Sequence, residues 1–114
     1  VRYLLENCST VQEGIEALKM IPIASSCNIL LADKSQEMLV AECNPFEINL
    51  REPEINAKGE RFIVTVNHFT SSKMQRYDGS KQNLYSSKAR YNFVCQKSFK
   101  REIWFYVPIP QNQI

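Results

Sequence analysis

The sequence has no long apolar run and almost no imbalance of charge, and each shortage excludes a class of protein. No segment approaches the roughly 20 apolar residues that a membrane-spanning helix needs. With 14 basic and 12 acidic residues the formal net charge is +2, which gives no electrostatic basis for binding nucleic acid. The N-terminus lacks the charged, then apolar, then small-residue pattern of a signal peptide. We therefore expect neither a membrane nor a nucleic acid as a partner.

Cysteine and histidine are also too sparse for a zinc site. Cys8, Cys27, Cys43 and Cys95 form no C-x-x-C pair, and the only histidine is His68. Because a zinc site needs closely spaced ligands, we expect no metal and no cofactor. Without a disulfide spacing pattern, a reducing compartment and hence a cytoplasmic location is the better expectation. Cys27 and Cys43 lie in strand-like contexts, where a free cysteine is commonly a small buried hydrophobe.

What is present predicts one domain over residues 1–114 that opens with helices. The length and a hydrophobic content of 44% suit one modest core. "VRYLLEN" predicts a short helix. Thr10 and Glu13 then have the spacing of a capping box, and Pro22 ends the helix that follows. Apolar residues recur at helical spacing inside it: Val11, Ile15 and Leu18.

A β-sheet and a last helix are predicted next. Residues 27–33 and 38–43 flank the polar turn 34–37 and predict a hairpin. Alternation over 46–50 predicts a third strand, and the β-branched run 61–66 a fourth, after a loop between Pro53 and Gly59. A helix begins at Ser86 or Ser87, with an apolar side from Ala89, Phe93 and Val94. This order predicts an α+β fold with an antiparallel sheet flanked by helices.

The strand "RFIVTV" stops at Asn67, followed at once by His68. A carboxamide at a strand end can donate hydrogen bonds to the oxyanion of an acyl-transfer intermediate; the alternative is an Asn that only begins a turn. A Cys–His nucleophile would give His68 a catalytic role, but a lone histidine is more often structural. Since side chains alternate along a strand, Asn67 and His68 should lie on opposite faces.

Arg90 is the second candidate, in the first turn of the last helix. Its guanidinium could bind a carboxylate, a thiolate or an oxyanion, or it could be an ordinary surface arginine. The residues alone leave both interpretations open.

Three motifs in one order resemble the linear amide C–N hydrolases, which include the choloylglycine hydrolases and the penicillin acyltransferase-like enzymes. "IPIASSCNILLADKSQEMLVAE" is similar to the strand–turn–strand of that family. "VTVNHF" resembles its strand that ends in a functional Asn, closer to the acyltransferase side, and "SSKARY" resembles its Ser-Ser-x-x-Arg helix start. With the opening "RYLLENCSTVQEGIEAL", the resemblance covers roughly residues 1–100.

The resemblance implies part of an N-terminal-nucleophile αββα sandwich that acts on small-molecule amides. In that mechanism an N-terminal Cys attacks the amide carbonyl and its own α-amino group is the base. Asn67 matches the oxyanion residue of the family and Arg90 its active-site arginine. Asp33 matches a motif that we interpret as hairpin chemistry.

The chain departs from the family in several places. It begins at Val1, so we expect the nucleophile to lie in an upstream segment. This chain would then be an interior or C-terminal piece, and we expect it to be inactive alone. Gln36 replaces the usual Gly of the hairpin turn, and the aromatic tail 103–114 does not follow the family's continuation. Two alternatives remain. The first is a non-catalytic module that uses an uncovered sheet and its tail to form a homo-oligomer or to associate with the missing segment. The second is a Cys–His protease of another fold.

Overall fold

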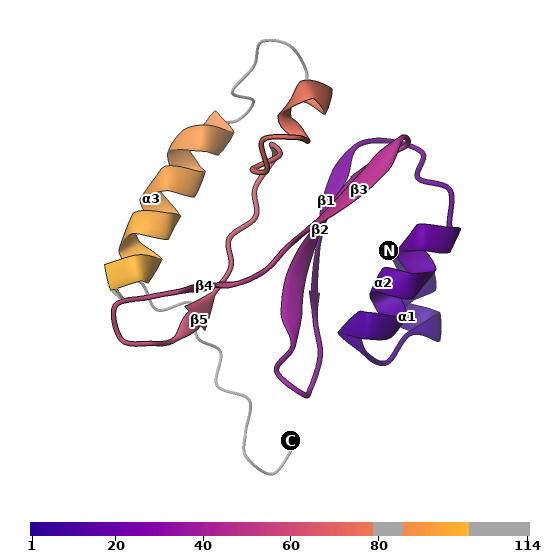
Figure 1. The fold of residues 1–114 in the computed structure, drawn as a ribbon, viewed down its shortest axis with the longest axis horizontal. Helices are drawn as coiled ribbons and strands as arrows, with labels where there is room; N and C mark the ends of the chain where they lie inside the picture. Colours follow the sequence, from indigo (N-terminus) through magenta and orange to yellow (C-terminus); the bar gives the residue numbers. More distant parts are fainter. Residues whose placement is uncertain (79–85, 101–114) are drawn as a thin grey trace.

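The computed structural model of this chain describes residues 1–78 and 86–100. Helices α1 (Arg2–Asn7) and α2 (Val11–Met20) precede an antiparallel sheet of order β1-β2-β3. Figure 1 shows α1 and α2 on one side of this sheet and α3 (Ser87–Lys100) on the other. The predicted α+β class, with an antiparallel sheet flanked by helices, is confirmed.

Helix α2 begins and packs as its sequence predicts. Its N-cap is Thr10, whose Oγ1 accepts a hydrogen bond from the backbone N–H of Glu13 at 3.1 Å. The Glu13 carboxylate in turn accepts the backbone N–H of Ser9 at 2.8 Å, so the reciprocal bond of the capping box falls one residue earlier than in the usual pattern. The predicted apolar stripe is buried: Val11, Ile15 and Leu18.

Strands β1 (Cys27–Ala32) and β2 (Met38–Asn44) form the predicted hairpin, in a register that pairs Ala32 with Met38. Asp33 organises the turn because its Oδ1 accepts the backbone N–H groups of Ser35 and Glu37. Its Oδ2 accepts the N–H of Val11 at 2.8 Å. Asp33 therefore joins the hairpin turn to the first residue of α2, in agreement with the interpretation of its motif as hairpin chemistry.

The two faces of the sheet differ in chemistry because side chains alternate along each strand. The face toward α1 and α2, here the apolar face, carries Ala41 and Cys43, both fully buried, beside Leu4 and Leu18 of the helices. The opposite or polar face carries Asn28, Glu42, Asn49 and Arg51, and the register sets Glu42 between Asn28 and Asn49. The hydrophobic cluster with the helices lies on the apolar face. The polar face, which also carries the fully buried Val40, meets residues 64–71.

The predicted fourth strand is wrong over most of its length. Strand β3 (Glu47–Arg51) is as expected, but in the run 61–66 only β5 (Arg61–Phe62) is a strand. It pairs with β4 (Glu54–Ile55), within the stretch predicted to be a loop, and not with the three-stranded sheet. Residues 63–66 continue without ladder pairing among the described residues and lead to a 3-10 turn, η1 (Gln75–Tyr77).

The last helix lies where it was predicted, but its apolar side is not buried as a stripe. Ala89 and Phe93 are exposed, and Val94 is half-buried. The buried residue of α3 is Ser87 at its start. The aromatic tail 103–114, expected to pack on a neighbour or on its own core, lies outside the described residues.

Candidate active site

Residues 64–71 lie on the polar face of the sheet, held by side chains from each of its three strands. Asn28 of β1 donates through Nδ2 to the carbonyls of Val66 and His68, both at 2.9 Å. Arg51 of β3 donates through Nη2 to the carbonyl of Val64 at 2.7 Å. These carbonyls lack ladder partners, so the side chains of the sheet replace the backbone bonds that a paired strand would make.

Glu42 of β2 is the most buried member of this network, with 0% of its surface exposed. Its carboxylate accepts the backbone N–H groups of Thr70 and Ser71 and a 3.5 Å hydrogen bond from Asn49. The Nε of Arg51 forms an ion pair with it at 3.4 Å. A buried carboxylate is tolerated only when it is paired and hydrogen-bonded in this way. Glu42 was not among the residues predicted for the site, although a charged residue inside the apolar run "MLVAEC" is a signal of such a role.

The structure brings Asn67 and Arg90 into direct contact. Arg90 of α3 donates through Nη2 to Oδ1 of Asn67 at 2.8 Å. The backbone N–H of Asn67 donates to Oγ of Ser87 at 2.8 Å, and Ser87 is only 1% exposed. Because a guanidinium only donates hydrogen bonds, it engages the carboxamide oxygen and leaves the Nδ2 donors to face elsewhere.

His68 and Asn67 both contact helix α3, so their side chains do not lie on opposite faces of the segment. Its Nδ1 lies 2.7 Å from Oγ of Ser87, and its ring meets Tyr91 edge-on with centroids 5.7 Å apart. The prediction of opposite faces is wrong because the chain here is not a paired strand, so strict alternation does not apply. Burial lowers the pKa of His68, with Asp78 opposing the shift, which favours a neutral imidazole near pH 7.

A surface depression of about 370 Å³ lies between the start of β1 and the segment that carries Asn67. Asn28 borders it and keeps its Oδ1 buried without a hydrogen-bond partner among the described residues. Phe69, another lining residue, is buried, and its backbone N–H donates to Oδ1 of Asp78 at 3.0 Å. The residues that line the depression are Ser26, Cys27, Asn28, Val66, Asn67, His68, Phe69, Tyr77 and Asp78.

The expectation that Cys27 is buried is wrong, because Cys27 is exposed while Cys43 is buried. Cys27 and His68 border the same depression, but their side chains contact different partners. The Cys27 thiol interacts with that of Cys43, and the His68 ring with Ser87 and Tyr91. The described contacts therefore give no support to a Cys–His nucleophile.

The described part of the chain contains neither a cluster of metal-ligand residues nor a membrane-spanning helix. Within residues 1–78 and 86–100, no three His, Cys, Asp or Glu side chains group as metal ligands would. None of the described helices combines the length and apolar character that crossing a bilayer requires.

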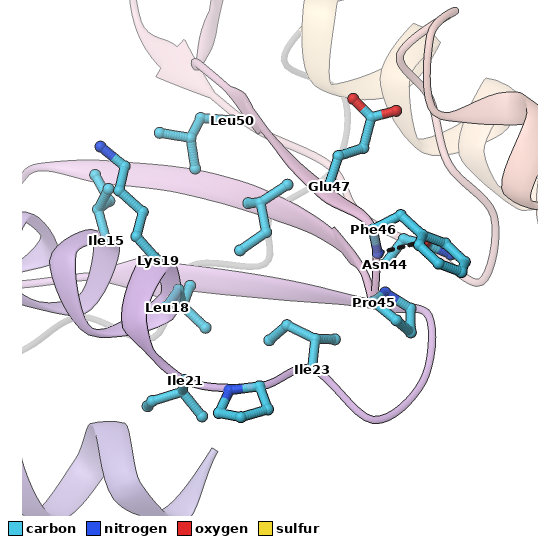
Figure 2. Close-up of a pocket in the computed structure, with 12 residues that line it drawn as sticks. Ile15, Leu18, Lys19, Ile21, Ile23, Asn44, Pro45, Phe46, Glu47 and Leu50 are labelled. Carbon is cyan, nitrogen blue, oxygen red and sulfur yellow. Dashed lines mark hydrogen bonds between the residues drawn. The ribbon is translucent and has the colours of Figure 1, made fainter.

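A second hollow lies on the other side of the sheet, beside α2. This α2 groove has a volume of about 410 Å³ and runs between the C-terminal half of α2 and the β2–β3 turn (Figure 2). Figure 2 shows that its lining is mostly apolar. The lining residues are Ile15, Leu18, Lys19, Ile21, Pro22, Ile23, Asn44, Pro45, Phe46, Glu47, Ile48 and Leu50.

Comparison with known proteins identifies the family. Searches of curated proteins and of solved structures found no match. The family model for acyl-coenzyme A:6-aminopenicillanic acid acyl-transferase matches residues 1–100. The helices and antiparallel sheet are consistent with part of the N-terminal-nucleophile domain that the resemblance implied. Since the match covers most of the chain, this protein belongs to the acyl-coenzyme A:6-aminopenicillanic acid acyl-transferase family.

Proposed function

We propose that this chain supplies the oxyanion-binding part of a cysteine N-terminal-nucleophile hydrolase or acyltransferase that acts on linear amide C–N bonds. The single observation that carries the proposal is the 2.8 Å hydrogen bond from Arg90 to Asn67 at the rim of the depression. Family membership over residues 1–100 supports the reaction class.

Asn67 is the proposed oxyanion donor. Its Oδ1 is engaged by Arg90, so the two Nδ2 hydrogens are the groups that a substrate could meet. A donor oriented before the reaction costs no reorganisation when negative charge develops on the carbonyl oxygen. Arg90 has two proposed effects: it fixes the carboxamide and it places a positive charge beside the developing oxyanion.

The nucleophile in this proposal is the thiol of an N-terminal Cys outside these 114 residues. Its sulfur bonds to the amide carbonyl carbon, and the α-amino group takes the thiol proton. The C–N bond then breaks, and the leaving amine takes that proton. The resulting thioester passes its acyl group to water or to an acceptor amine. The 114-residue chain alone is expected to be inactive.

Kinetics of the intact enzyme test the proposal, with a panel of N-acyl p-nitroanilides as chromogenic amides. N67A should lower kcat by about 10²–10³-fold with little change in KM, as for loss of an oxyanion donor. Gln96→Ala, an exposed amide lower on α3, is the matched control and should retain full activity. A normal kcat in N67A would reject the role of Asn67. Turnover by the 114-residue chain that disappears in C27A or C8A would reject an outside nucleophile.

A second candidate function, assembly through an uncovered surface, is favoured by the α2 groove. Phe46 at its rim is 83% exposed, and Met20 at the end of α2 is 85% exposed. Large exposed apolar side chains favour association. We propose a homo-oligomer or a complex with the rest of the enzyme that covers this groove. Sedimentation should show association that F46S weakens and F93S, on the distant helix α3, does not. A monomer at high concentration would reject self-association.

A further inference from the structure

Two cysteines lie directly opposite each other on neighbouring strands, at the end of the hairpin remote from its turn. Cys27 is the first residue of β1, and the register pairs it with Cys43 of β2. Directly paired residues project from the same face of a sheet. Cys27 is exposed, whereas Cys43 is fully buried. The pair thus joins a thiol that reagents can reach to one that they cannot.

The spacing of the pair is close to that of a disulfide. Directly opposite residues of an antiparallel pair have Cβ atoms about 4.5–5.5 Å apart, and a disulfide holds them about 3.5–4.5 Å apart. Bond formation therefore needs a movement of about 1 Å. The position of Cys27 at the start of its strand favours this movement, because Ser26 and the residues before it are outside the ladder.

We propose that Cys27 and Cys43 are a thiol–disulfide exchange site that forms a reversible intramolecular disulfide with low-molecular-weight disulfides such as oxidised glutathione. The Cys27 thiolate attacks one sulfur of glutathione disulfide and releases one glutathione thiolate. Cys43 gives up its proton and attacks Sγ of Cys27, which releases the second glutathione. Two cysteine thiols are oxidised and one glutathione disulfide is reduced to two glutathiones, so no other oxidant is needed.

The order of the two attacks follows from burial. The pKa of the Cys43 thiol is raised to about 12, first by burial and then by the neighbouring Cys27. Since the thiolate is the nucleophile, the exposed Cys27 reacts first and Cys43 resolves the mixed disulfide. The adjustment needed for closure leaves some strain in the bond, and strained disulfides are the easily reduced ones.

The exchange site shares one lining residue, Cys27, with the depression of the candidate active site, but it uses neither of the proposed catalytic residues, Asn67 and Arg90. Cys27 lines the Asn67 depression, and the next residue, Asn28, holds the carbonyls on both sides of Asn67. Closure of the disulfide moves the start of β1 and should therefore alter the surroundings of Asn67. The exchange chemistry itself is independent of the proposed catalytic role, so failure of one leaves the other standing.

The experiment equilibrates the 114-residue chain with buffers of increasing oxidised-to-reduced glutathione ratio, followed by acid quenching, alkylation and peptide mapping. We expect a Cys27–Cys43 linked peptide that disappears on return to reduced glutathione. C95S is the matched control and should form the same link. C27S, which changes an exposed side chain, should leave Cys43 unmodified. C43S should accumulate glutathione on Cys27.

Three results would overturn the proposal. A wild-type chain that keeps glutathione on Cys27 while Cys43 stays reduced would show that the buried thiol does not resolve. A link from Cys27 to Cys8, or to Cys27 of another molecule, would show a different pairing. Reaction of Cys43 in folded C27S would show that Cys27 is not the entry point. If C43S does not fold, the mapping of the wild-type chain and of C27S still decides between these outcomes.

Discussion

The guanidinium of Arg90 holds the carboxamide oxygen of Asn67 at 2.8 Å, between two residues 23 positions apart in the sequence. Arg90 belongs to the first turns of α3, whereas Asn67 lies on the segment fixed to the polar face of the sheet. The contact therefore joins α3 to the segment on the sheet and fixes the orientation of the carboxamide that we propose as the oxyanion donor. Changes at Asn67 should separate these two effects.

Asn67→Asp should keep the contact with Arg90 and lose the proposed catalytic donors. A carboxylate accepts from a guanidinium at least as well as an amide oxygen does, so the free energy of unfolding should change by less than about 1 kcal/mol for this exposed pair. The two Nδ2 hydrogens are gone, however, and kcat of the intact enzyme should fall by about 10²–10³-fold. Urea unfolding and steady-state kinetics on one preparation measure both quantities.

The control for this change is Gln96→Glu, the same amide-to-carboxylate exchange on an exposed position of α3. It should leave kcat and stability unaltered. Full activity of N67D would mean that the carboxamide donates nothing to the transition state. A large loss of stability in N67D would mean that its contact with Arg90 depends on the amide.

Glu42→Gln should destabilise the fold and loosen the segment that carries Asn67. The change leaves the partly buried Arg51 charge without its partner and weakens the bonds to Thr70 and Ser71. Breaking a buried ion pair from one side costs about 3–5 kcal/mol. Denaturant unfolding measures the loss, and amide hydrogen exchange should be faster at Thr70 and Ser71 than in the wild-type chain.

Glu6→Gln is the matched control, because it removes an ion pair with Arg2 on the surface of α1, where the side chains are 58% and 89% exposed. Exposed pairs of this kind contribute less than about 1 kcal/mol. Equal destabilisation by the two changes would contradict the special role of Glu42.

Local signals in the sequence predicted the first half of the fold. The Thr10 cap, the spacing of the apolar residues in α2 and the polar turn before Met38 are short-range features, and each appears in the structure as expected. The roles of Asn67 and Arg90 as candidate site residues were predicted differently, through motifs resembling a family. Spacing alone could not show that two residues 23 positions apart touch.

The second half was predicted less well, because tertiary contacts override local pattern there. The run 61–66 is β-branched and favours a strand, yet side chains of Asn28 and Arg51 bind its carbonyls in place of a neighbouring strand. The exposure of Phe93 likewise depends on what α3 packs against, and the spacing of apolar residues in the sequence does not show this. Such contacts are between residues far apart in sequence, so no local window reveals them.

His68 should titrate below its ordinary pKa of 6.5 in the folded chain, because burial disfavours the imidazolium. The unfolded state then binds more protons just below pH 6.5, so the His68 contribution to stability is complete above that pH and is lost as the pH falls through the lower, folded pKa. As the sequence has one histidine, its ring proton NMR signal can be followed without assignment, in buffer and in urea.

Ser87→Ala tests the hydrogen bond behind this behaviour. The Ser87 hydroxyl accepts the N–H of Asn67 and can donate its proton to a neutral Nδ1 of His68. Removing the hydroxyl takes away a hydrogen bond that stabilises the neutral imidazole, so the pKa of His68 should rise toward 6.5. The N–H of Asn67, whose hydrogen bond is part-buried, also loses its acceptor, which should cost about 0.5–1.5 kcal/mol. An unchanged His68 pKa in S87A would mean that the Ser87 hydroxyl does not contribute to the lowered pKa.

Gln36→Gly should stabilise the chain, and Gly59→Ala should destabilise it, for the same reason. Both residues have positive φ, 71° at Gln36 and 78° at Gly59, a region that costs a residue with a Cβ about 1–2 kcal/mol. Replacing Gln36 with glycine removes that cost. It also raises the conformational entropy of the unfolded state, which offsets the gain by roughly 0.4–1 kcal/mol. A Cβ on Gly59 would meet no atom within 4 Å, so its effect is conformational only.

The backbone contacts of Gln36 survive its replacement, since its N–H donates to Asp33 and its carbonyl accepts from Arg61. Urea unfolding should therefore place the midpoint of Q36G above, and that of G59A below, the wild-type midpoint. A stabilised Q36G would show that Gln36 leaves the turn geometry intact and only strains it. If Q36G is instead destabilised, the glutamine side chain contributes a contact that outweighs the strain.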